Sequence, residues 1–86
     1  MSIATAQAQA ITLQLDNEVK LESIDRMVAI GESIGNADLY LIALKDAVRQ
    51  GRLDAARRAI GEILIELRLA ANETQLLDKL VVSAGA

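Results

Sequence analysis

Apolar residues recur along most of this chain at the three- and four-residue spacing of a helix with one packed face. Between Leu13 and Ile34 they fit a helix with a broad apolar side. Proline is absent, and Ala, Leu, Glu, Gln, Arg and Lys, which favour helices, are abundant. The pattern therefore predicts an all-α fold of three, or at most four, helices arranged as an antiparallel hairpin or bundle.

Glycine and asparagine mark the expected ends of the first two helices. Gly35 suits the residue that follows a helix, and Asn36 suits the cap of the next one. A second helix is expected from about residue 37 to residue 50, closed by Gly51. Its six consecutive apolar residues, 39–44, surround a helix completely, so they should be covered on more than one side.

The third helix has the most regular pattern in the chain. It is expected to begin near Arg52 or Leu53 and to reach Val82, either as one helix or with Asn72 capping a short fourth helix. We favour one helix, because only Asn72 interrupts the pattern. The 4-3-4-3 spacing predicts the packed face of this helix, formed by Ala56, Ile60, Ile63, Leu67, Ala70, Thr74, Leu77 and Val81.

The stretch 40–56 resembles the helix–turn–helix of one tetratricopeptide repeat. In that family a Gly closes the first helix and a small residue five positions later packs on the second, as Gly51 and Ala56 do here. The resemblance covers about half of one repeat, and Leu44 stands where the family prefers a small residue. Since no second copy follows, the resemblance implies only an antiparallel hairpin around Gly51.

The chain length of 86 residues fits a single small domain. We expect this helical domain at 13–82, with a simple segment at 1–12 that either frays or extends the first helix, and a frayed tail at 83–86. The uncharged first fifteen residues lack the basic start of a secretory signal, and no long uncharged apolar run follows them. A cytoplasmic protein without a membrane segment is expected.

Composition removes much of enzyme chemistry. Cys and His are both absent, so thiolate nucleophiles, disulfides, imidazole bases and the usual soft metal ligands are missing. Carboxylates such as Glu62 and Glu66 fit a solvated ladder of i,i+4 pairs with Asp54 and Arg58 better than a metal site. We therefore expect no catalytic residues, no metal and no cofactor.

The remaining signal is an excess of aliphatic surface. Hydrophobic residues make up 52% of the chain and aromatic residues 1%, more than one small hairpin can cover. A homodimer that completes its core between two hairpins resolves this excess. The side chains expected at a dimer or partner interface are Leu39, Tyr40, Ile42, Ile60, Ile63, Leu64, Leu67 and Leu77.

Basic residues cluster around the predicted turn at 45–58. The charged contacts expected with a partner are Arg49, Arg52, Arg57 and Arg58. The leading interpretation is a dimeric, non-enzymatic adaptor, regulator or inhibitor that binds and masks another protein. The alternative is a small nucleic-acid-binding regulator that uses this turn, although the net charge of −3 and the lack of stacking aromatics weigh against it.

Overall fold

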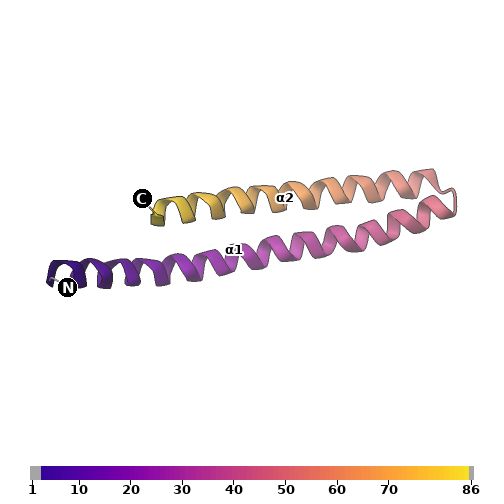
Figure 1. The fold of residues 1–86 in the computed structure, drawn as a ribbon. Helices are drawn as coiled ribbons and strands as arrows, with labels where there is room; N and C mark the ends of the chain where they lie inside the picture. Colours follow the sequence, from indigo (N-terminus) through magenta and orange to yellow (C-terminus); the bar gives the residue numbers. More distant parts are fainter. Residues whose placement is uncertain (1–2, 86) are drawn as a thin grey trace.

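The computed structural model describes residues 3–85, with side-chain surroundings for 17–84. Helix α1 (Ile3–Arg49) and helix α2 (Leu53–Gly85) form one antiparallel hairpin, so the all-α fold class is confirmed. The hairpin is a narrow rod with extents of 70 × 15 × 15 Å (Figure 1). The prediction of three or four helices is wrong, because the described residues form two.

The turn between the helices forms where the sequence predicts it. Gly51 has a φ of 67°, the left-handed conformation that glycine adopts without steric cost. The Arg52 N–H donates to the Ala47 carbonyl (2.8 Å) and the Gly51 N–H to the Val48 carbonyl (3.1 Å). These two bonds form a Schellman motif, which satisfies carbonyls at the end of α1 and reverses the chain.

The predicted helix end at Gly35 and Asn36 does not exist, because α1 continues through both residues. The less exposed positions Ile30, Ser33, Ala37 and Tyr40 keep their three- and four-residue spacing across this point. One Gly in a helix costs about 1 kcal/mol, a penalty that packing on both sides of it offsets. A terminator therefore needs the left-handed conformation, which Gly51 adopts and Gly35 does not.

Helix α2 is continuous through Asn72, as favoured from the sequence. Its first turn includes a bond from the Ala56 N–H to the Arg52 carbonyl (3.0 Å). Two residues after Asn72, the Thr74 hydroxyl donates to the Ala70 carbonyl (2.6 Å). Asn72 is exposed, so its side chain does not disturb the packing against α1.

The two helices meet along a seam that repeats every seven residues. On each helix the less exposed positions alternate at spacings of three and four, as in a coiled coil. The most buried side chains are small, with exposed fractions of 5–9%. They are Ser33, Ala37, Ala47, Ala56, Ala59 and Ala70.

The predicted packed face of α2 is half correct. Ala56, Ile63, Ala70 and Leu77 face the seam, but the other four positions are exposed and are replaced by the row on their other flank. That row consists of Ala59, Glu66, Glu73 and Leu80. The predicted and the observed faces share the row that begins at Ala56, and both have the same three- and four-residue spacing. The pattern alone therefore does not decide which of the two neighbouring rows of α2 completes the contact with α1.

Helix α1 is longer than α2, with 47 residues against 33. Its N-terminal part therefore extends beyond the C-terminal end of α2 (Figure 1). Each residue advances the same distance along its helix, so residues equally far from the turn lie at the same level. Asp16 is therefore about level with Gly85, and residues 3–15 have no neighbouring helix.

Candidate interaction surface

An ion pair links the two helices near the open end of the hairpin. The Arg26 guanidinium lies 3.0 Å from the Glu73 carboxylate and 3.8 Å from the Glu22 carboxylate. The Arg26 and Glu73 side chains are about one-third and one-quarter exposed. This partly buried contact helps to hold the register of the two helices.

The small seam leaves the large apolar side chains outside it. Eighteen of them are exposed among the described residues, and no large side chain there is fully buried. On α1 one row has a strict seven-residue spacing, with exposed fractions of 39–64%. This row consists of Met27, Ile34, Leu41 and Val48.

Helix α2 carries a matching exposed row. Leu53, Ile60 and Leu67 repeat every seven residues, Thr74 interrupts the series, and Val81 resumes it. Their apolar members are 46–71% exposed. Each row lies next to the seam, about one-fifth of a turn around its helix.

Both rows lie on the same side of the hairpin. Val48 and Leu53 line one shallow groove beside the turn. At the open end, Met27 and Val81 line another groove, together with Ile24 and Ala84. The apolar face is defined here as the two rows together: Met27, Ile34, Leu41 and Val48 with Leu53, Ile60, Leu67 and Val81.

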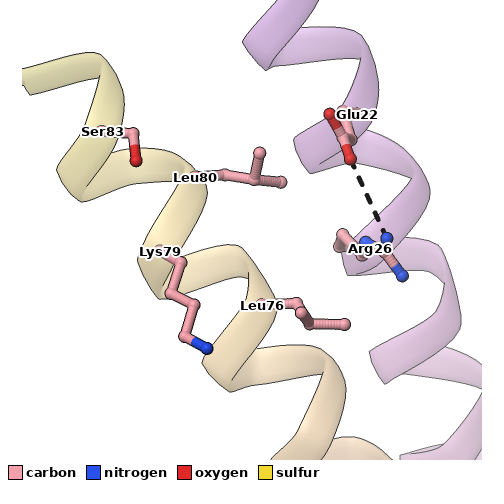
Figure 2. Close-up of a pocket in the computed structure, with 6 residues that line it drawn as sticks. All are labelled: Glu22, Arg26, Leu76, Lys79, Leu80 and Ser83. Carbon is pink, nitrogen blue, oxygen red and sulfur yellow. Dashed lines mark ion pairs between the residues drawn. The ribbon is translucent and has the colours of Figure 1, made fainter.

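The opposite side of the hairpin is more polar. Glu22 and Arg26 of α1 lie across a groove from Lys79 and Ser83 of α2, and the Leu76 and Leu80 side chains reach toward α1 between them (Figure 2). Along α1 this side also carries Asp25, Glu32 and Asn36, all exposed or partly exposed. The hairpin therefore has one apolar side and one mixed side, where charged residues alternate with exposed apolar ones such as Leu69 and Leu76.

A separate groove lies on the outer surface of α1 near the turn. Leu39 and Ile42, which are 66% and 58% exposed, line it with Lys45, Asp46 and Arg49. It brings together two predicted interface residues, Leu39 and Ile42, and one predicted charged contact, Arg49. An apolar centre with charges of both signs around it suits a helix of another protein.

The other predicted interface residues divide into two groups. Ile60, Leu64 and Leu67 are about half exposed on α2, on or beside the apolar face. Tyr40, Ile63 and Leu77 are partly buried in the seam and pack within the hairpin.

Sequence reasoning missed the α1 row of the apolar face. Its seven-residue spacing was a usable signal, but the expected helix break at Gly35 divided the row between two helices. The interhelix pair of Arg26 with Glu73 was also missed, because 47 residues separate its partners.

The predicted charged contacts are all exposed around the turn. Arg49 lies at the end of α1, Arg52 in the turn, and Arg57 and Arg58 in the first turns of α2. Because Arg57 and Arg58 are adjacent in a helix, they point about 100° apart. The structure therefore arranges the arginines around the tip of the hairpin and does not place them on one face.

The predicted charge ladder is not formed. Among the described side chains, the ion pairs within 4.0 Å are those of Arg26, and Arg58 makes none with Asp54 or Glu62. Over the same residues, no three acidic side chains converge as a metal site would require.

One segment of α1, Asn17–Arg49, is long and apolar enough to cross a membrane by length and composition. Only 6% of its most apolar part is buried in the hairpin. Glu32 and Asp38 lie in the middle of this segment. Carboxylates at mid-membrane are costly, about 2.5–3.5 kcal/mol for Asp.

No family model, curated protein or solved structure matches this chain.

Proposed function

We propose that the protein is a non-enzymatic helical interaction module that acts as a dimer and binds a partner protein. The observation that carries the proposal is the seam of small residues, which leaves eighteen large apolar side chains exposed on a two-helix rod. Fully burying a Val, Leu or Ile side chain stabilises by about 1.5–3 kcal/mol. Exposed apolar surface of this extent is typical of proteins that bury it against other chains.

The outer groove of α1 supports binding to a partner. It lies off the apolar face, so a dimer formed through that face leaves the groove accessible. Its edge carries Lys45 and Arg49 against one carboxylate, Asp46, so the net positive charge favours a partner whose apolar helix carries acidic residues. We further propose that the protein acts in the cytoplasm, which fractionation of tagged cells tests.

Affinity capture with variants of this groove tests partner binding. Ile42→Asp should reduce recovery of the partner at least about tenfold, because it places a carboxylate among the apolar contacts. The matched control is Glu32→Asp, on the more polar side of the same helix. Equal recovery with wild type, Ile42→Asp and Glu32→Asp would contradict the proposal.

Nucleic-acid binding is the competing outcome for the tip of the hairpin. Mobility-shift assays with duplex DNA and single-stranded RNA at low salt test it directly, because phosphate binding weakens steeply as salt rises. We expect no shift. A shift that disappears when Arg52 and Arg57 are changed to Gln would favour the nucleic-acid alternative.

A further inference from the structure

The two rows of the apolar face share one level near the middle of the paired region. Ile34 lies 17 residues before Gly51 and Leu67 lies 16 residues after it, so the two side chains are level on neighbouring helices. On α1, Met27 and Leu41 lie seven residues to either side of Ile34. On α2, Leu53 and Val81 lie fourteen residues to either side of Leu67. These apolar residues are symmetric about the same level of the rod, whereas the remaining positions are not, since Lys20 stands opposite Val48 and Thr74 opposite Ile60.

We propose that a second copy of this chain covers the apolar face, about a two-fold axis that is perpendicular to the helices and passes Ile34 and Leu67. In this arrangement α1 packs against the partner's α1 and α2 against the partner's α2, each pair antiparallel. The product is a four-helix bundle with the two turns at opposite ends. The inference depends on the dimer in the proposed function and adds its face, axis and helix pairing.

Charges at the edge of the face support this axis. The row of α2 beside the apolar face consists of Arg57, Leu64, Ala71 and Asp78. Arg57 lies ten residues before Leu67 and Asp78 eleven after it. The axis therefore brings each Arg57 level with an Asp78 from the other copy, and two such pairs flank apolar residues at the centre. Edge charges of this kind set partner and orientation in helical bundles.

The other face-to-face two-fold arrangement is less favourable. An axis parallel to the helices would place α2 over the α1 of the second copy. Residues that are equally far from the turn of their own chain would then face each other. Arg57 and Lys45 each lie six residues from Gly51, so this axis brings like charges together twice.

The size of the face also suits a dimer. Helix α2 is about 50 Å long at 1.5 Å per residue, and the rod is 15 Å wide. The flat side that faces a second copy is thus about 750 Å², close to the roughly 800 Å² per partner of a standard stable interface.

Engineered cysteines test the axis, since the chain has none of its own. Leu67→Cys places the new thiol beside the same thiol of the second copy, so mild oxidation should link the two chains by a disulfide. Ile34→Cys should do the same. The matched control is Glu62→Cys, on the other side of α2, which should stay unlinked. Non-reducing gels read out linkage, and circular dichroism confirms that each variant is helical.

A charge swap tests the edge contacts by analytical ultracentrifugation. Arg57→Asp should raise the dimer dissociation constant about tenfold, because two attractive pairs become repulsive. Combining it with Asp78→Arg should return the dissociation constant to within about threefold of wild type.

The outcomes separate this inference from the proposed function. A dimer in which Leu67→Cys stays unlinked, or in which the charge swap fails to restore affinity, overturns the axis and leaves a dimer. If the wild-type chain is still a monomer at about 100 µM, a concentration well above a micromolar dimer dissociation constant, both the axis and the proposed dimer are overturned. Co-sedimentation of the wild-type chain with phosphatidylcholine–phosphatidylglycerol vesicles, with loss of the dimer, also overturns the inference because lipid would then cover the face.

Discussion

At the scale of single residues, Arg26 is the side chain that joins the two helices by charge. Its 3.0 Å contact with Glu73 is partly shielded from water, whereas its 3.8 Å contact with Glu22 lies within one helix at a more exposed carboxylate. Shielded, hydrogen-bonded pairs contribute more than exposed i,i+4 pairs. The interhelix pair should therefore matter more to stability than the intrahelical one.

Glu73→Gln should lower the free energy of unfolding by about 1 kcal/mol, because it removes the charge that Arg26 pairs with across the seam. The matched control Glu22→Gln should cost less than about 0.5 kcal/mol. Urea unfolding at one fixed protein concentration measures both. Equal losses of unfolding free energy in the two variants would show that the interhelix contact stabilises the hairpin no more than the intrahelical one does.

At the scale of elements, one glycine ends a helix whereas others lie within a continuous helix. Gly51 ends α1 in the left-handed conformation, while Gly35 and Gly61 lie in helical backbone with open space where a Cβ would be. Sequence alone treats Gly35 and Gly51 as equivalent breaks. Backbone conformation separates them.

Gly51→Ala should destabilise the hairpin by about 1–2 kcal/mol, because an L-residue is strained at positive φ. Gly35→Ala should instead stabilise it by up to about 1 kcal/mol, since alanine loses less entropy in a helix and meets no atom there. Thermal unfolding of both variants checks the signs. A destabilising Gly35→Ala would mean that the helix is not continuous at that residue.

The seam between the elements depends on small side chains. Ala47 is 5% exposed and shares the groove beside the turn with Ala56. Ala47→Leu should cost about 1–3 kcal/mol through overpacking. The control Ala43→Leu, one turn earlier at an exposed position, should change stability by less than about 0.5 kcal/mol. If urea unfolding shows similar effects for both, the seam does not pass through Ala47.

At the scale of the whole molecule, the proposed dimer differs in shape from the hairpin. Ile34 lies near the middle of the part of α1 that pairs with α2, but it does not lie in the middle of α1 as a whole. Helix α1 begins 31 residues earlier, at Ile3. An antiparallel pairing about Ile34 therefore projects the two ends of α1 in opposite directions. The dimer becomes longer than the 70 Å hairpin.

Small-angle X-ray scattering should give the wild-type dimer a maximum dimension of about 90 Å, at 1.5 Å per helical residue. Dilution until the dimer dissociates should return a rod of about the hairpin's 70 Å length. A 70 Å dimer would contradict the antiparallel pairing and favour an axis parallel to the helices.

The sequence by itself determined the helical class and the turn at Gly51, and it favoured the continuity of α2 at Asn72 over a short fourth helix. These features are local: helix propensity, a missing proline and a glycine in the left-handed conformation act within a few residues. The excess of apolar surface was also readable from composition, because burial capacity depends on chain length.

Only the tertiary structure decided that α1 passes through Gly35, which rows of α2 face the seam, and that Arg26 meets Glu73. Each depends on contacts between residues far apart in the chain, and adjacent apolar rows on a helix are equivalent until a second helix packs on one of them. Choosing the alanine-rich seam left the large aliphatic rows outside. Eight of the eighteen exposed large apolar side chains thus form the apolar face, and the other ten lie elsewhere on the surface of the rod, Leu39 and Ile42 among them.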